Sequence, residues 1–333
     1  MMRWLFRLAL VALIAAGVTV HTPAPLVYRP GEGWTYESIG GAKWRRTRAK
    51  DQLEVAQEAF DRKDFKMAYR AARYVVRTWP LSDYAPKAQY LVGRCLEEKR
   101  SDEKAFRAYQ TLMTKYPKID SYEDVLDRQY AIANRFLAGQ WFKLWGVIPF
   151  FSSMDKTVKM YEELIKNGPY SKVAPPSQMS IGTAREKQSD FVGAVKAYEK
   201  AADKYHDMGT VAPDAIYKAG EAYHKQATTA DYDQSVAGKA IATFSDFTTL
   251  YPTEPRVAGA QKTILALRTE QARGNYQTAR YYEKKRKWEA ALIYYNEVLL
   301  KDANSTFAEE AKQRIETLKQ RVAQQAQKQP AAR

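Results

Sequence analysis

The chain has 333 residues, of which 45% are hydrophobic, 27% are charged and 13% are aromatic, and its formal net charge is +15. This hydrophobic content is sufficient for a large core and excludes a chain that is disordered over most of its length. The single cysteine, Cys95, excludes a fold held together by internal disulfides, so stability must come from packing.

The first 45 residues differ in composition from the rest. Arg3 and Arg7 precede an uncharged apolar run at residues 8–20, which is short for a membrane span. This order predicts that residues 1–20 are a signal peptide or an N-terminal anchor, cleaved or retained as a tether, and that the protein is exported. Residues 21–45 are rich in proline and glycine, which predicts a linker without regular structure.

From about Arg46 onward, apolar residues recur at helical spacing, and no segment alternates convincingly as a strand. A helix-pair phrase repeats along this region, with a small residue where two helices must touch and a large aromatic residue on the second helix. Two copies of the phrase contain Gly93, Ala105 and Tyr109, and Gly182, Ala194 and Tyr198. This is the pattern of a tetratricopeptide repeat. It predicts an all-α, right-handed superhelix of about five or six helix pairs with a C-terminal capping helix over residues 46–322, followed by a disordered tail at 323–333.

The third helix pair carries an aromatic insertion at residues 137–153. Three interpretations are open: the insertion folds back over the repeat core, it offers aromatic side chains to a protein partner, or it enters a membrane interface. The candidate contact residues are Trp141, Phe142, Trp145, Phe150 and Phe151.

The sequence contains little that indicates catalysis. Its three histidines, His21, His206 and His224, have no companions at metal-ligand spacing, and there is no glycine-rich phosphate loop or nucleophile elbow. We therefore expect no catalytic residue, no cofactor, no metal and no small-molecule substrate. An enzyme built on a helical superhelix is the least favoured class of function.

The inner surface of the superhelix is the better candidate site, because the first helix of each pair lines it. Two tyrosines one repeat apart, flanked by cations and amides, could clamp an extended peptide, with the cations taking a terminal carboxylate. The alternative is a solvated concave face without a ligand. The candidate residues are Lys50, Gln57, Lys87, Tyr90, Arg94, Tyr130 and Asn134.

Basic residues cluster at 43–50 and at 284–287. Such clusters attract nucleic acid, anionic lipid or acidic proteins, and export removes nucleic acid from this set. An anionic membrane surface therefore stays among the expected partners.

Residues 281–298, with a Tyr-Tyr pair, a basic turn and an alanine-rich helix, and residues 65–91 resemble the BamD family of outer-membrane assembly factors of diderm bacteria. The resemblance covers about residues 46–322, and the chain would be a divergent member because no lipidation cysteine follows its apolar run. It implies a periplasmic scaffold at the outer membrane, whose N-terminal repeats hold C-terminal segments of unfolded barrels. Its C-terminal repeats would dock on the barrel insertase and other assembly subunits, with Tyr282, Lys285 and Arg286 as candidate contacts. The alternative is a general periplasmic repeat adaptor in envelope or division complexes.

Overall fold

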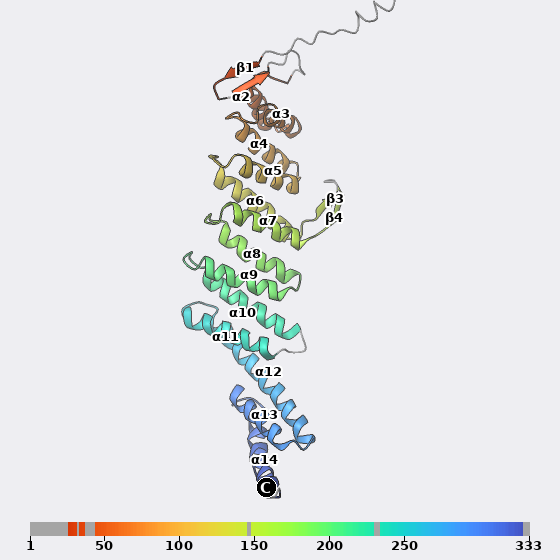
Figure 1. Cartoon of the computed structure of the whole chain (residues 1–333), viewed down its shortest axis with the longest axis vertical. Helices are drawn as coiled ribbons and strands as arrows, with labels where there is room; N and C mark the ends of the chain where they lie inside the picture. Colours follow the sequence, from red (N-terminus) through yellow and green to blue (C-terminus); the bar gives the residue numbers. More distant parts are fainter. Residues whose placement is uncertain (1–25, 32, 37–43, 145–147, 230–233, 329–333) are drawn as a thin grey trace, which may run out of the picture. The chain divides into compact units, whose positions relative to one another are not determined.

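The structure is a computed structural model that describes residues 26–31, 33–36, 44–144, 148–229 and 234–328 (Figure 1). The apolar run at residues 8–20 lies outside the described residues. The chain divides into two compact units, one comprising residues 1–125 and 143–148 and the other comprising residues 126–142 and 149–333.

The first unit begins with a β-hairpin. Strands β1 (Leu26–Arg29) and β2 (Gly33–Tyr36) pair antiparallel, and Tyr28 lies opposite Trp34 with their ring centroids 5.3 Å apart. The prediction that residues 21–45 lack regular structure is therefore wrong for this stretch. Aromatic and β-branched residues favour the strands, and a glycine-containing turn allows them to pair.

The turn of this hairpin is attached to the first helical repeat. Gly31 and Gly33 have φ angles of +76° and +73°, a left-handed conformation that glycine adopts without steric cost. The carbonyl oxygen of Gly31 accepts hydrogen bonds from the Asp83 backbone N–H at 2.8 Å and from Ser82 Oγ at 3.1 Å. The hairpin thus contacts the connection that precedes the third helix of the unit.

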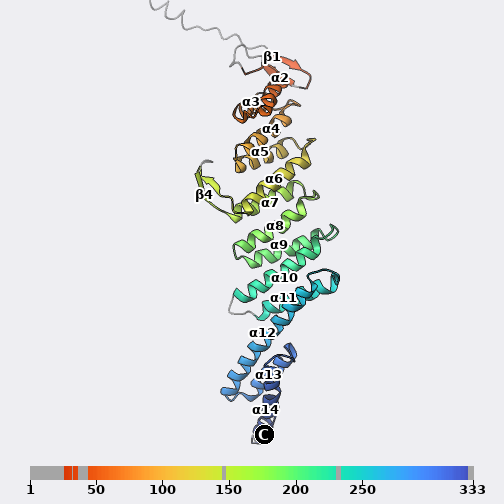
Figure 2. The same cartoon turned by 180° about the vertical axis from the view of Figure 1, so that it is seen from behind.

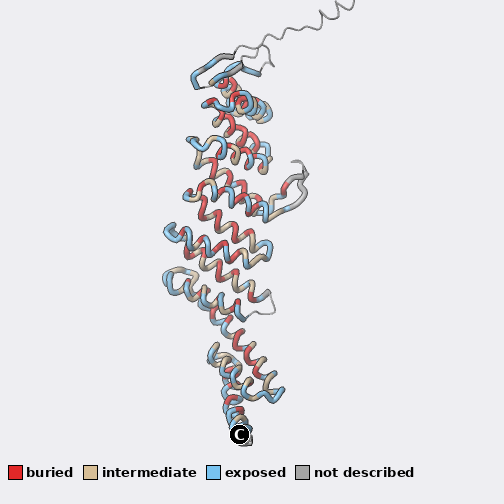
Figure 3. Tube along the Cα trace, viewed as in Figure 1, coloured by how far each residue is buried: buried red, intermediate tan, exposed pale blue. Residues whose placement is uncertain are grey.

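Helices of similar length fill the rest of the first unit. They are α2 (Ala49–Asp61), α3 (Phe65–Thr78), α4 (Ala85–Glu98) and α5 (Asp102–Lys115), and α6 (Tyr122–Leu137) starts here and continues into the second unit. Helix α3 packs against α2 and α4, and α4 packs against α5. Buried residues recur along each of these helices (Figure 3). Many of these buried residues are alanines, which allow the helices to approach closely.

The second unit continues the same alternation of helices, with the long helix α12 visible in Figure 2. Its further helices are α7 (Met154–Asn167), α8 (Ala174–Lys187), α9 (Phe191–Lys204), α10 (Val211–Thr229), α11 (Gln234–Leu250), α12 (Val257–Lys284), α13 (Trp288–Lys301) and α14 (Ala308–Lys328). Over the described residues this gives six helix pairs, from α2 with α3 to α12 with α13, and a final helix. The predicted all-α tetratricopeptide-repeat class is confirmed, with two short hairpins added to it.

A glycine facing an aromatic ring sets the distance between the helices of a pair. A Cβ atom added at Gly93 of α4 would lie 2.7 Å from two ring carbons of Tyr109 on α5, so only glycine fits against this ring. The prediction that a small residue lies where two helices touch is therefore confirmed here, and the residue it touches is the aromatic of the same helix pair. The same relation joins Gly182 to Tyr198 and Gly220 to Phe244.

A buried glutamine adds a second link within two of the pairs. Gln89 Nε2 donates to the carbonyl oxygen of Ala108 at 2.8 Å, and Gln178 Nε2 donates to that of Ala197 at 3.0 Å. Each glutamine lies one helical turn before the glycine of its pair, and each acceptor directly precedes the aromatic residue. The hydrogen bond therefore fixes the register of the two helices beside the glycine contact.

The aromatic insertion contains a second hairpin. Strands β3 (Phe142–Leu144) and β4 (Ile148–Phe151) form a two-stranded sheet between α6 and α7. The expectation that no segment forms a strand is therefore wrong here as well. A short apolar run cannot be assigned to helix or strand by periodicity alone, and this one is rich in aromatic residues.

The last helix extends beyond its predicted end. Helix α14 continues to Lys328, whereas a disordered tail was predicted from residue 323. Alanine, glutamine and lysine are good helix formers, and lengthening an existing helix requires no new nucleation. Residues 329–333 lie outside the described residues.

Candidate functional site

A pocket of about 540 Å³ opens in the first unit, on the side formed by α2, α4 and the segment before α6. Both helices are the first of their pair, as expected for an inner surface. The pocket is lined by Leu53, Glu54, Gln57, Phe60, Asp83, Pro86, Lys87, Tyr90, Leu91, Arg94, Lys118, Ile119, Asp120 and Ser121.

Arg94 is the half-buried cation of this pocket. Its guanidinium carbon lies 5.2 Å from the centroid of the Phe60 ring and 5.9 Å from that of Tyr90, distances typical of cation–π contacts. Nη1 donates a weak hydrogen bond of 3.3 Å to the Tyr90 hydroxyl. The Nε atom is buried, and no described residue accepts a hydrogen bond from it. The hydrogen-bonding capacity of this guanidinium is thus incompletely used.

Tyr90 is held in place at the edge of the pocket. Its hydroxyl donates to Asp124 Oδ2 at 2.5 Å, and its ring lies 6.2 Å from that of Tyr109. Arg94, Tyr90 and Asp124 therefore form a short polar chain from the pocket to the start of α6. Because both ends of this chain are anchored on helices, the aromatic wall is preorganised for a ligand.

Charges of both signs surround the pocket. The basic residues are Arg94, Lys87 and Lys118, and the acidic residues are Glu54, Asp83 and Asp120. These charges balance, so net attraction does not select a ligand. Selection must instead come from the position of the half-buried guanidinium beside two aromatic rings.

The structure brings together four of the seven predicted groove residues: Gln57, Lys87, Tyr90 and Arg94. Lys50 is exposed but does not line the pocket. Tyr130 and Asn134 belong to the second unit, where Asn134 Oδ1 accepts a hydrogen bond of 2.6 Å from Tyr161 and the Tyr130 ring packs 6.1 Å from that of Tyr161.

Sequence reasoning missed Phe60, which supplies one of the two rings around Arg94. Leu53, Gln57 and Phe60 follow one another at spacings of four and three residues, so Phe60 lies on the same face of α2 as the other two. This spacing was the signal that could have identified it.

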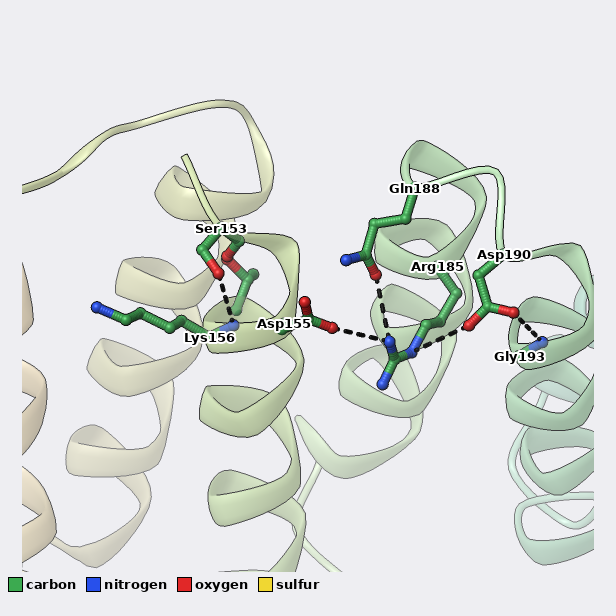
Figure 4. Close-up of polar contacts among 8 residues, drawn as sticks. Ser153, Asp155, Lys156, Arg185, Gln188, Asp190 and Gly193 are labelled. Atoms are coloured by element: carbon green, nitrogen blue, oxygen red, sulfur yellow. Dashed lines mark hydrogen bonds and ion pairs between the residues drawn. The ribbon is translucent and has the colours of Figure 1, made fainter. Parts of the chain in front are cut away.

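Polar contacts from α8 support the helices on either side of the aromatic insertion, and Figure 4 shows those that Arg185 makes. Arg185 Nη1 donates to Asp155 Oδ1 at 2.9 Å in the first turn of α7, and its Nε lies 3.8 Å from Asp190 Oδ2, on the residue that caps α9. Lys187 Nζ donates to the carbonyl oxygen of Leu137, the last residue of α6, at 2.7 Å. The end of α6 and the start of α7 therefore both form hydrogen bonds with the C-terminal end of α8.

The predicted contact residues of the insertion divide into different environments. Trp141 is 54% exposed, as a contact residue would be. Phe142 is 2% exposed and stacks on Phe136 at 4.2 Å, so its assignment to a partner or membrane surface is wrong. Its ring completes the core at the end of α6 because burial of an aromatic side chain is strongly favourable. Trp145 lies outside the described residues, and Phe150 and Phe151 belong to β4.

At the C-terminal end, Tyr281 is exposed in place of its neighbour Tyr282, which was the predicted docking residue. Tyr282 is half-buried and stacks on Tyr294 at 5.4 Å, whereas Tyr281 is 58% exposed with Lys285 Nζ 5.8 Å from its ring centroid. Lys285 and Arg286 are exposed, as predicted for docking residues. A pocket beside them is lined by Gln277, Arg280, Tyr281, Glu283, Lys284, Trp288, Arg314 and Arg321.

Two further kinds of site are absent from the described part of the chain. No group of three His, Cys, Asp or Glu side chains there is arranged to hold a metal ion. No described helix combines the length and the apolar character that a membrane crossing requires.

Comparison with known families gives two matches. Residues 87–118 match a tetratricopeptide-repeat model, and these residues span most of α4 and all of α5 with the Gly93–Tyr109 contact. The protein has the tetratricopeptide-repeat fold. Residues 152–302 of this repeat protein match a family described as outer membrane lipoprotein, a stretch that runs from the end of the insertion to just beyond α13. No curated protein sequence matches the chain.

Several solved repeat structures are similar in arrangement. A TPR repeat-containing protein from Cytophaga hutchinsonii shares 14% identity, with 79% of this chain and 87% of that chain covered and a TM-score of 0.37. A tetratricopeptide-repeat protein from Parabacteroides merdae shares 12% identity over 81% and 98% of the two chains, with a TM-score of 0.34. PilW, described as a type IV pilus biogenesis factor, shares 10% identity over 80% and 99%, with a TM-score of 0.29. These values are too low to carry an argument about function.

Proposed function

We propose that the protein is a non-enzymatic scaffold on the periplasmic side of the outer membrane, which takes part in the assembly of β-barrel proteins. The match of residues 152–302 to an outer membrane lipoprotein family supports a place in the cell envelope. The repeat fold supports a role in binding other proteins, because such arrays offer long continuous surfaces to their partners. In this proposal the first unit binds C-terminal segments of unfolded barrels, and the second unit docks on the barrel insertase.

The observation that carries the proposal is the pocket around Arg94. Phe60 and Tyr90 offer rings against which an aromatic side chain can pack, and Leu53 and Leu91 add apolar surface. A carboxylate of the ligand would pair with the guanidinium of Arg94, which is half-buried and lies beside both rings. A peptide that ends in an aromatic residue with a free C-terminus combines both features.

The exposed basic turn after α12 supports the docking part of the proposal. Tyr281, Lys285 and Arg286 are exposed together there, next to further arginines of the adjacent pocket. An acidic segment on a periplasmic domain of the insertase would match this surface in charge.

Peptide binding to the full chain tests the pocket. A fluorescent peptide with alternating aromatic residues and a free C-terminus is titrated in parallel with its C-terminal amide. We expect Arg94→Gln to weaken binding of the free acid by about 10- to 100-fold, because a hydrogen bond to a charged group contributes about 1.5–3 kcal/mol. The matched control is Arg107→Gln on α5, which removes an exposed arginine of the same unit and should leave affinity unchanged. Equal affinities for the acid and the amide would refute the proposed site.

Crosslinking in cells tests the biological role. A photoreactive amino acid in place of Lys87, which is exposed at the rim of the pocket, should capture unfolded barrel proteins, and one in place of Tyr281 should capture the insertase. Capture of division or cell-wall proteins, with no barrels, would instead identify a general envelope adaptor.

A further inference from the structure

Helix α3 carries an unbroken row of positive charge on its outer face. Lys66, Arg70, Arg73 and Arg77 follow one another at spacings of four, three and four residues, which places them within one narrow strip of the helix. All four are exposed, and helix α3 contains no acidic residue. The strip is about 16 Å long at 1.5 Å per residue. We call these four residues the α3 cationic strip.

The opposite face of helix α3 packs against the rest of the fold, and the strip faces solvent. Ala68, Ala71, Ala72 and Val75 are fully buried against neighbouring helices. None of the four cations forms an ion pair within the part of the chain that the structure describes. Surface cations are normally interspersed with acids along a helix, so an unpaired row of this kind is unusual for a face that only contacts water.

Aromatic rings and further cations flank the strip. The guanidinium carbon of Arg73 lies 6.0 Å from the Tyr69 ring centroid, and Lys99 Nζ lies 5.5 Å from the same ring. On the same helix, Tyr74 has the guanidinium carbon of Arg45 5.2 Å from its ring centroid. Cations interleaved with tyrosine are typical of surfaces that lie at a membrane interface.

We propose that the α3 cationic strip docks the first unit on an anionic phospholipid surface, with lysine and arginine side chains contacting the headgroup phosphates. A line of exposed cations matches a flat field of phosphates. Helix α3 also belongs to the repeat that lies nearest in sequence to the apolar run at residues 8–20. This inference is independent of the peptide pocket, since none of the strip residues lines it.

Vesicle co-sedimentation of the full chain tests the inference. The vesicles contain either phosphatidylcholine alone or phosphatidylcholine with about one third phosphatidylglycerol, and binding to the first is the baseline for both variants. The test variant carries Lys66→Gln, Arg70→Gln, Arg73→Gln and Arg77→Gln. The matched control carries Lys166→Gln, Lys196→Gln, Lys200→Gln and Lys204→Gln, which removes the same charge from exposed positions of the second unit.

Each basic residue near an anionic bilayer strengthens binding by roughly fivefold. We therefore expect the test variant, which lacks four such residues, to lose roughly 600-fold in affinity for the anionic vesicles, with binding to phosphatidylcholine unchanged. The control variant should lose less than about fivefold in affinity for the anionic vesicles.

Equal losses of affinity in the two variants would show a net-charge effect and overturn the proposal, as would an unchanged affinity of the test variant. A loss confined to binding of a soluble acidic polypeptide, with vesicle binding intact, would assign the strip to an acidic protein instead. Because all four side chains are exposed, circular dichroism should show the same folded state in both variants.

Discussion

The contact between Gly93 and Tyr109 gives the sharpest prediction. The substitution Gly93→Ala places a methyl group 2.7 Å from two carbons of the Tyr109 ring, whereas carbon atoms normally approach to about 3.5 Å. The ring cannot simply move away, because Tyr109 is fully buried and its hydroxyl donates to Glu97 Oε2 at 2.5 Å. The third carbon, Cε1, would lie closer still, so helices α4 and α5 must separate by more than about 1 Å or the ring must leave its rotamer.

Two opposing effects determine the magnitude. Overpacking a core costs about 1–3 kcal/mol, and the upper end applies here because the ring is enclosed. Alanine is favoured over glycine in a helix by about 1 kcal/mol. We therefore expect a net destabilisation of about 2 kcal/mol. The matched control is Gly238→Ala in α11, where the nearest atom to an added Cβ is Gln271 Nε2 at 3.9 Å, and the same substitution should stabilise the helix by up to about 1 kcal/mol.

Hydrogen exchange measured by mass spectrometry suits a repeat array, because it reports local opening where a single unfolding transition does not apply. Amides of α4 and α5 should exchange about 30-fold faster in Gly93→Ala, and amides of α11 should exchange up to about fivefold more slowly in Gly238→Ala. In a double-mutant cycle with Tyr109→Leu, the two substitutions should couple by about 2 kcal/mol. If Gly93→Ala were neutral or stabilising, the ring would not set the helix spacing and the reasoning would be refuted.

Three further predictions concern buried and bridging groups. Burial raises the pKa of the Cys95 thiol from 9.0 to about 12, so the thiol should resist alkylation at pH 8 in the folded protein. The unfolding free energy should fall as pH rises from 9 to 12, because only the unfolded chain loses the thiol proton in this range. The variant Cys95→Ala should lack this part of the pH dependence. Tyr295→Phe should cost about 1.5–3 kcal/mol in local stability measured by hydrogen exchange, because its hydroxyl donates to the Glu283 carboxylate. Tyr161→Phe should cost about 1 kcal/mol, because its hydroxyl donates to the neutral amide oxygen of Asn134 at 2.6 Å, and equal costs would contradict this ranking. Arg185→Gln should speed hydrogen exchange in the first turn of α7 by no more than about fivefold, since its partner Asp155 is 63% exposed, and a larger effect would mean that the ion pair is better shielded from water than its exposure implies.

The repeat architecture could be predicted because the contacts that define it are local in sequence. Gly93 and Tyr109 belong to adjacent helices, so their spacing alone places them face to face once both helices form. The same reasoning placed Gln57, Lys87, Tyr90 and Arg94 on one surface, because the first helices of successive pairs share an orientation.

The features that were not predicted depend on tertiary contacts, which the spacing of apolar residues along the chain does not determine. The β3–β4 hairpin arises from a short aromatic run that suits a strand as well as a helix, and the fold then buries Phe142 against Phe136. Asn134 lies on the predicted face of α6, but the Tyr161 hydroxyl uses its side chain. Tyr281 and Tyr282 are adjacent, and the packing of Tyr294 decides which of the two is exposed.

The glutamine link described above occurs twice in the same register. Gln89, Gly93 and Tyr109 correspond to Gln178, Gly182 and Tyr198, and each residue of the second set follows its counterpart by 89 positions. Both contacts, the hydrogen bond of the glutamine and the packing of the ring on the glycine, thus lie within one helix pair. The outward-facing side chains of such a helix pair can therefore change, or be replaced by those of the other pair, without altering the contacts that hold its two helices together. Within one helix pair, different residues thus determine the binding specificity and the packing of the helices.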